Sequence, residues 1–444
     1  MYIVYTNLPS NLSSIKTSEL IKMPNDDWKS YVHDPRIVCK YGAKCYQKNP
    51  EHHKNYKHPP QKFAMVNNSR NKKRYSPYTK RNNDQHAESS NKEEAKKDIE
   101  SMSQRLEDFT TDFSQEASPS NIKFEKFSIP ENLKYFENDR EVIKQQFLVH
   151  MPDDFYKFYE SLNDNNNIEK TLGSVNLQLI GPFDVLLGKL PILDNKDVYL
   201  THWRFYYDPP EFQAVLKKKG NSQFHIGYYR DDPDNDPVFL AKNDSAKDCK
   251  IIPIAKNIFA AVYIHLQSEK NVSPFMAMAC QKVIEKLKIA AEKYNFPLEE
   301  YNMKHRQADI ITKTLHGAGI VVPYNKKTQL GYRNLTETDA NLKKIFTRLK
   351  EATDQNEKDK ILSELQPVIT YANIAVDECD FGTGLEAGID LFCSGLKELE
   401  PSALSCLKSA YSLLNREVFS KIIEAHIKYR RLSSNLSVLD ILVA

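Results

Sequence analysis

The sequence predicts an α+β fold: a small cysteine- and histidine-containing segment and a disordered, polar linker precede a large, mainly helical body with a patch of short β-strands. Two observations carry this prediction. Apolar residues make up only 40% of the 444 residues and concentrate after Ile122, so part of the chain lacks a core. Within the body, the apolar pattern changes from helical spacing to short alternating runs and back to helical spacing.

In the body, a helix is expected to begin after Pro152, with Asp153 and Asp154 favourable in its first turn. Residues 177–187 indicate a strand or turn leading into an apolar helix, and short strands are expected at 223–230, 237–240 and 250–254. Helices are expected at 257–266, 275–294, 338–364 and 402–432. Strands followed by mainly helices indicate an α+β body.

We divide the chain into a loose leader (1–33), a Cys/His segment (34–60), a linker (61–120) and the body (121–444). Between Gln61 and Arg81 there are seven basic residues and no acidic one. This composition cannot repay the entropy of ordering. The run Asn71–Arg74 suits nuclear import or contact with a polyanion, and an ordinary solvated linker explains it equally well.

Composition sets limits on the class of protein. The net charge of +3 gives no argument for nucleic-acid binding, whereas the segregation of acidic and basic residues along the chain does. Seven scattered cysteines do not make a disulfide framework. Polar residues follow Tyr5 directly, and no apolar run reaches the ~18–20 residues of a membrane span. We expect a soluble intracellular protein.

The Cys/His segment has metal-ligand spacing. Cys39, Cys45, His52 and His58 form a C-x5-C-x6-H-x5-H pattern, and two thiolates with two imidazoles suit tetrahedral Zn²⁺. The segment holds too little apolar side chain to fold without metal. The spacing does not fit a DNA-reading C2H2 finger. A disordered basic segment with chance cysteines and histidines is the alternative.

Four carboxylates lie around Gly382-Thr-Gly384: Asp377, Glu378, Asp380 and Glu386. Crowded carboxylates need a cation, a proton or open water. A Gly-x-Gly break turns the backbone sharply, and apolar residues at helical spacing follow it. The pattern predicts an acidic loop in front of a packed helix, with a solvated acidic turn as the alternative.

Tyr332 and Arg333 precede a helix that Thr336 or Thr338 can cap. An exposed Tyr-Arg pair is a typical interface anchor, and Arg333 is a possible cation for the carboxylates. An ordinary surface loop is the alternative. The glycine-rich turn at 316–319 favours a structural turn over a nucleotide loop, and residues 202–204 favour a core role over a catalytic one. The sequence contains neither a Gly-x-Ser-x-Gly elbow nor a His-Glu-x-x-His motif.

The Cys/His segment closely resembles the poly(ADP-ribose)-binding (PBZ) zinc finger in Tyr41-Gly42, Cys45-Tyr46 and the run 48–50. The resemblance implies Zn²⁺ bound by the four ligands, and adenine and phosphate groups of the polymer held near Tyr41 and Tyr46. Gln47 stands where the family usually has arginine, so a bidentate phosphate donor is lost and binding is expected to be weaker.

The body resembles the histone PARylation factor family in residues 202–213, 312–319, 331–333 and 377–386. The resemblance implies an accessory factor, not a free-standing enzyme, that docks on the catalytic domain of DNA-damage-activated poly(ADP-ribose) polymerases. Glu378 would be the glutamate that enables serine, notably in histones, to accept ADP-ribose. Asp377, Tyr332 and Arg333 would face the polymerase, which would bind NAD. The implied location is the nucleus, at damaged chromatin.

The implied partners are the polymerase, histones and poly(ADP-ribose) chains; neither a membrane nor sequence-specific nucleic acid is expected. Two departures matter: Val376 stands where an asparagine is expected, and residues 394–401 lack the expected basic and aromatic character. Asp380 and Glu386 are expected to be structural. Two other hypotheses stay open: a poly(ADP-ribose) reader and scaffold without a catalytic role, and an independent ADP-ribose hydrolase.

Overall fold

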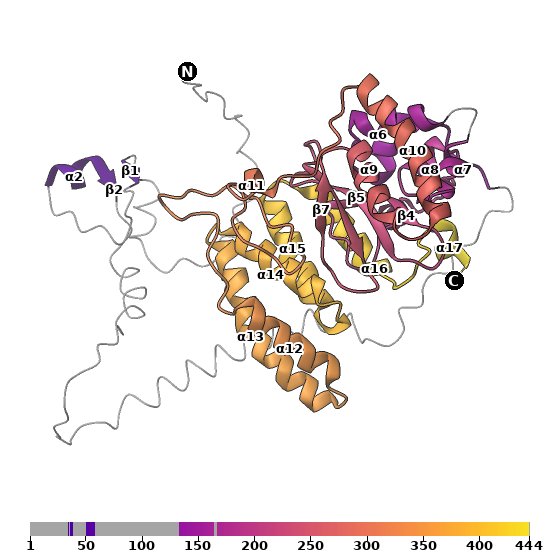
Figure 1. The fold of residues 1–444 in the computed structure, drawn as a ribbon. Helices are drawn as coiled ribbons and strands as arrows, with labels where there is room; N and C mark the ends of the chain where they lie inside the picture. Colours follow the sequence, from indigo (N-terminus) through magenta and orange to yellow (C-terminus); the bar gives the residue numbers. More distant parts are fainter. Residues whose placement is uncertain (1–33, 35, 39–49, 58–132, 164–166, 444) are drawn as a thin grey trace. The chain divides into compact units, whose positions relative to one another are not determined.

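A computed structural model describes residues 34, 36–38, 50–57, 133–163 and 167–443 (Figure 1). They belong to two units of the chain, Met1–Ser120 and Asn121–Ala444. The expected leader and linker lie outside the described residues, and so do Tyr41, Tyr46, Cys39, Cys45 and His58. Among the described helices, none combines the length and apolar character of a membrane span.

In the first unit, a parallel pair of short strands flanks a short helix. Strand β1 (Ile37–Val38) pairs with β2 (Tyr56–Lys57), and Val38 lies opposite Lys57. Helix α2 (Pro50–Asn55) lies between them in sequence, begins with a proline and carries His52. The strands end one residue before Cys39 and His58, respectively.

The second unit contains an antiparallel sheet whose strands pair in chain order. These are β3 (Leu177–Leu179), β4 (Phe212–Lys218), β5 (Phe224–Tyr229), β6 (Phe239–Asp244) and β7 (Ile252–Ala255). The α+β prediction is therefore confirmed. Strand β5 lies within the run predicted at 223–230, whereas β6 and β7 overlap the runs predicted at 237–240 and 250–254 and extend beyond their ends. Strand β4 was not predicted, because six of its seven residues are buried and apolar alternation is lost.

One group of helices packs with the sheet around the larger core. They are α5 (Arg140–Phe147), α6 (Asp153–Leu162), α7 (Ile168–Gly173), α8 (Phe183–Leu186), α9 (Ile258–Glu269) and α10 (Pro274–Lys293). Figure 1 shows α6, α9 and α10 gathered beside the sheet. Helix α6 begins after Pro152, as predicted, and its Phe155 stacks on Phe183 with ring centroids 4.0 Å apart.

The C-terminal half is helical and forms a second core. It comprises α12 (Asp339–Glu351), α13 (Gln355–Asp377), α14 (Phe381–Cys393), α15 (Glu400–Leu413) and α16 (Glu417–Tyr429), with α11 (Met303–Arg306) before them and the 3₁₀ turn η4 (Lys397–Leu399) between α14 and α15. The 3₁₀ turn η3 (Lys196–Thr201) comes earlier in the chain and adds Leu200 to this core, whereas Val438 of α17 (Val438–Val443) belongs to the larger core. Helices α12 and α13 lie side by side in Figure 1. Each predicted C-terminal stretch is two helices, because the chain turns at 352–354 and at Asn415, where φ is 58°.

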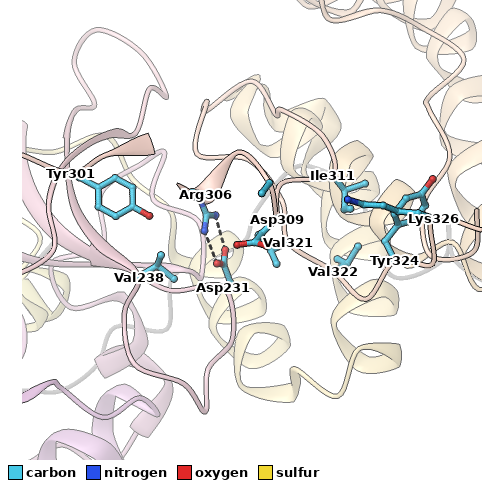
Figure 2. Close-up of a pocket in the computed structure, with 11 residues that line it drawn as sticks. Asp231, Val238, Tyr301, Arg306, Asp309, Ile311, Val321, Val322, Tyr324 and Lys326 are labelled. Carbon is cyan, nitrogen blue, oxygen red and sulfur yellow. Dashed lines mark hydrogen bonds and ion pairs between the residues drawn. The ribbon is translucent and has the colours of Figure 1, made fainter. Parts of the chain in front are cut away.

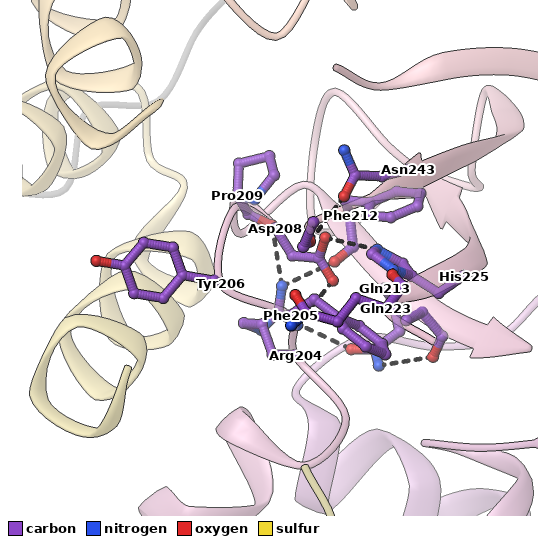
Figure 3. A network of polar contacts seen from close by, with 12 residues as sticks. Arg204, Phe205, Tyr206, Asp208, Pro209, Phe212, Gln213, Gln223, His225 and Asn243 are labelled. Atoms are coloured by element: carbon purple, nitrogen blue, oxygen red, sulfur yellow. Dashed lines mark hydrogen bonds and ion pairs between the residues drawn. The ribbon is translucent and has the colours of Figure 1, made fainter. Parts of the chain in front are cut away.

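A buried polar network at the edge of the sheet confirms the core role predicted for residues 202–204 (Figure 3). The Arg204 guanidinium donates hydrogen bonds to the backbone oxygens of Leu200, Pro209 and Phe212. Burial lowers the pKa of Arg204 to about 10. Three carbonyls satisfy this buried cation, so Arg204 stabilises the fold and has no reason to be catalytic.

Candidate functional site

The predicted acidic cluster lies where α13 meets α14. Helix α13 ends at Asp377 and α14 begins at Phe381, so only residues 378–380 connect them. Cys379 adopts a positive φ of 68°, which makes the sharp turn. Asp377 and Glu378 are exposed, and 61% of the Glu378 side chain is accessible to solvent.

The prediction of a Gly-x-Gly break was wrong. Gly382 and Gly384 belong to the first turns of α14, and neither has a positive φ. A Cβ on Gly384 would lie 2.3 Å from Cγ2 of Val376, closer than van der Waals contact permits. The glycine therefore lets α13 and α14 pack closely, and the turn is made before it. Val376 is buried in this helix contact.

The loop carrying Tyr332 and Arg333 is tied to the start of α14. Gly331 donates its backbone N–H to Oδ1 of Asp380 (2.8 Å) and accepts from the N–H of Gly382 (2.9 Å). The hydroxyl of Thr383 accepts from the N–H of Arg333 (3.0 Å) and donates to its carbonyl (2.7 Å). These four bonds bring residues 331–333 beside the acidic connection.

Glu386 holds the same loop from the next turn of α14. Its carboxylate accepts from the hydroxyls of Thr312 (2.6 Å) and Tyr332 (3.1 Å). Burial raises the pKa of Glu386 above its ordinary value. Burial also raises the pKa of Tyr332. Tyr332 is half-buried, not exposed as expected, and its hydroxyl is directed into the body.

Arg333 provides the cation that the carboxylates need. Its Nη2 lies 2.7 Å from Oε2 of Glu378 and its Nε 3.2 Å from Oδ2 of Asp380. The guanidinium also lies over the ring of Tyr371, 5.2 Å from the centroid. Asp380, with its side chain 12% exposed, is the inner carboxylate, and Glu378 is the outer one. The structure therefore places Glu378 at the solvent side of a fixed cation.

The structure thus brings four of the predicted site residues together: Asp377 and Glu378 on the connection, and Tyr332 and Arg333 on the loop beside it. Their roles stay predictions. His52 belongs to the other unit, with the remaining predicted zinc ligands outside the described residues. Within the described part of the chain, no group of three or more metal-ligating side chains is assembled.

An open pocket of about 500 Å³ lies between the sheet and the segment from Asp309 to Lys326 (Figure 2). Arg306 and Asp231 lie in it and form two bonds with each other, of 2.6 and 2.7 Å. Because this pair neutralises itself, the pocket offers a weaker case for chemistry than the acidic connection. The predicted structural turn near it is confirmed, since Gly317 and Gly319 have positive φ.

Thr312 and Thr383 were missed as contributors to the site. Thr383 was visible only as the residue between two glycines, and Thr312 lies in a different stretch of sequence. A hydroxyl has no sequence signature until the fold shows what it contacts. Glu386 was expected to be structural, and its contacts with the hydroxyls of Thr312 and Tyr332 show how that role is carried out.

Comparison with known proteins identifies two segments. The family model of histone PARylation factor 1 matches residues 138–430, and the model of the PBZ domain matches residues 36–61. Histone PARylation factor 1 of Bos taurus is 41% identical over 66% of this chain and 86% of its own length. The Danio rerio protein of that name is 40% identical over 70% of this chain and 89% of its length. A putative histone PARylation factor 1-like protein of Homo sapiens is 38% identical over 66% of the chain and 86% of its length. The chain belongs to the histone PARylation factor 1 family.

Proposed function

We propose that this chain is an accessory factor of poly(ADP-ribosyl)ation that completes the active site of a poly(ADP-ribose) polymerase with Glu378. The observation that carries the proposal is the position of that carboxylate. It is exposed on the three-residue connection between α13 and α14, and Nη2 of Arg333 lies 2.7 Å from it. A base of this kind is available to a reaction that takes place on a partner's surface.

The chemistry suits a carboxylate. A serine hydroxyl is a weak nucleophile at neutral pH, so it needs a base within hydrogen-bond reach when it attacks an oxocarbenium-like ribose carbon. A carboxylate also stabilises positive charge that develops on the sugar. The polymerase would hold NAD, and Glu378 would take the proton from the serine of a histone or another acceptor.

Asp377 is proposed to dock the polymerase together with Tyr332 and Arg333. It is exposed and ends α13, where the partial negative charge of the helix terminus disfavours a second negative charge. A cation on the partner would relieve that repulsion. Since Tyr332 and Arg333 are tied to α14 by their backbone and hydroxyl contacts, the three residues form one preorganised surface.

Glu378→Gln tests the catalytic role. We expect the variant to bind the polymerase as the wild type does but to lose serine modification of a histone peptide in the presence of NAD. The matched control is Glu364→Gln, because Glu364 is an exposed glutamate of α13 that pairs with Arg348 at 2.8 Å. The control should retain both activities. Normal serine modification by Glu378→Gln would refute the catalytic role of Glu378.

We further propose that the N-terminal segment binds Zn²⁺ through Cys39, Cys45, His52 and His58, and poly(ADP-ribose) near Tyr41 and Tyr46. The donor set of two thiols and two imidazoles fits zinc. The parallel pairing of Val38 with Lys57 also fits a zinc site, because Cys39 and His58 are the next residues in the sequence after these paired strand ends. The finger would bring the body to existing polymer on chromatin in the nucleus and raise its local concentration.

Cys45→Ala should lower the zinc content of the purified protein and abolish binding to poly(ADP-ribose), while serine modification with purified polymerase continues. His53→Ala is the matched control, because His53 neighbours His52 on α2 but does not fit the ligand spacing. A normal zinc content in Cys45→Ala would refute the ligand assignment, and so would loss of zinc in His53→Ala.

A further inference from the structure

Cys249 and Cys393 are distant in sequence but meet in the second unit. Cys249 lies in the turn between β6 and β7, and Cys393 is the last residue of α14. Cys249 packs against the core cluster that contains Cys393, and interaction with the Cys393 thiol is the main cause that lowers the pKa of Cys249. They are free thiols in the described structure.

Hydrogen bonds around the two cysteines hold their segments together. Ile251 donates its N–H to the carbonyl of His316 (2.9 Å), and the Lys250 ammonium donates to the carbonyl of Leu315 (2.7 Å). Leu315 in turn donates its N–H to Oδ1 of Asp390 (2.8 Å), which lies one helical turn before Cys393. The β6–β7 turn is therefore anchored to the C-terminal end of α14 through residues 315 and 316.

The two thiols have different environments. Cys249 is half-buried; its interaction with the Cys393 thiol lowers its pKa, and the nearby Lys250 adds to this effect. Cys393 is buried, and burial raises its pKa well above the ordinary value. A thiolate is the reactive form of cysteine. Cys249 therefore has the character of an attacking thiol, and Cys393 that of the thiol that resolves its oxidised product.

The other cysteines of the second unit lack such a partner thiol among the contacts described. Cys280 and Cys406 are buried, and burial raises the pKa of both, that of Cys406 to about 11. Cys379 is exposed on the acidic connection. These three thiols serve as internal references for the reactivity of the pair.

We propose that Cys249 and Cys393 form an oxidation site that hydrogen peroxide converts to a disulfide. The Cys249 thiolate attacks one peroxide oxygen, the O–O bond breaks, and the products are a sulfenic acid and, after protonation, water. The Cys393 sulfur then attacks the Cys249 sulfur, the S–O bond breaks, and a second water leaves with the thiol proton. Overall, two thiols and one peroxide give one disulfide and two waters.

The disulfide would join the sheet to α14. The opposite end of α14 starts at the acidic connection, so the covalent link would fix one end of the helix that organises the candidate site at its other end. A cross-link that closes so long a stretch of chain also restricts the unfolded state. The oxidised protein should therefore melt at a higher temperature than the reduced protein. This inference does not depend on the role proposed for Glu378.

The experiment uses the full chain, reduced, desalted and then exposed to increasing hydrogen peroxide. Remaining thiols are alkylated in denaturant, and the protein is digested without reduction and analysed by mass spectrometry. We expect one peptide pair, joined through Cys249 and Cys393, that has lost two hydrogen atoms and separates on treatment with dithiothreitol. Cys280 and Cys406 should be alkylated in full, and the melting temperature should rise only in the oxidised sample.

Variants assign the two steps. Cys249→Ser should prevent the disulfide, whereas Cys393→Ser should leave a sulfenic acid on Cys249 that dimedone traps. Cys280→Ser is the control and should form the disulfide normally. The proposal is overturned if wild-type Cys249 and Cys393 are both alkylated after Cys379 has been oxidised, or if the disulfide joins separate chains. Since the first result comes from the wild type, it does not depend on a variant that folds.

Discussion

Thr383→Val offers the sharpest test of how the candidate site is held together. The Thr383 side chain is fully buried, and its hydroxyl bonds both the N–H and the carbonyl of Arg333. Valine has nearly the same shape, so the substitution removes the hydroxyl and little else. Each backbone group that loses its partner in a buried place costs about 1–3 kcal/mol. Because Arg333 is only half-buried and water can reach part of the loop, we expect a total of about 2 kcal/mol.

Urea unfolding measures this loss, and Thr347→Val provides the matched control. Thr347 is exposed on α12, and its hydroxyl donates to the carbonyl of Lys343 at 2.8 Å. Its removal should change the free energy of unfolding by less than about 0.5 kcal/mol. Thr383→Ser keeps the hydroxyl and should therefore retain most of the stability that Thr383→Val loses.

The same variant should weaken docking on the polymerase. If Arg333 must be ordered again on binding, a penalty of about 1.4 kcal/mol raises the dissociation constant about tenfold. Titration calorimetry with the isolated polymerase catalytic domain measures this constant. Wild-type stability and affinity in Thr383→Val would refute the reasoning and show that other contacts fix the loop. A loss in Thr383→Ser together with wild-type behaviour of Thr383→Val would show that methyl packing, not the hydroxyl, matters.

Two further predictions concern the fold that supports the site. Burial raises the pKa of Asp154 to about 6, so its contribution to stability is full below the ordinary pKa of about 4 and is lost as pH rises through 6. In urea unfolding, the free energy of unfolding of Asp154→Asn should therefore rise relative to that of the wild type by up to about 3 kcal/mol from pH 4 to pH 7. The control is Asp153→Asn, at the exposed neighbouring residue, which should show no such trend. A difference between Asp154→Asn and the wild type that stays constant with pH would contradict this reasoning. Gly227→Ala should lower the free energy of unfolding by about 3 kcal/mol, because its Cβ would lie 2.4 Å from the carbonyl oxygen of Gln213. Gly173→Ala is the control and should lower the free energy of unfolding far less, because its Cβ would meet only the end of the flexible Lys219 side chain. Equal losses of stability in the two variants would refute the argument.

The sequence predicted those parts of the fold where local pattern and tertiary packing agree. Helix α6 has a proline and two acidic residues at its start, and α9 and α10 have long apolar periods, so their positions were visible. Strands β5, β6 and β7 are short runs bounded by polar turns. In each case the residues that determine the element are neighbours in the chain.

The failures occurred where a distant contact decides the local structure. Strand β4 is buried on both faces and pairs with β3 and β5, so its residues carry no alternating pattern. The glycines of α14 suggested a break, because only the packing of Gly384 against Val376 reveals why a helix would tolerate them. Similarly, Tyr332 was expected to be exposed, and the contact with Glu386 that buries its hydroxyl lies fifty-four positions away.

The same contacts explain how one helix can carry so much negative charge. Asp380 and Glu386 point toward the 331–333 loop and accept hydrogen bonds from it, so these two carboxylates hold the loop against α14. Asp377 and Glu378 precede α14 and face solvent, where only Arg333 approaches Glu378 among the contacts described. A fold that needed only a solvated turn at this place would not require an arginine shared between an inner and an outer carboxylate. Replacing Arg333 with lysine should separate the two roles, because a single ammonium cannot reach both carboxylates as the planar guanidinium does.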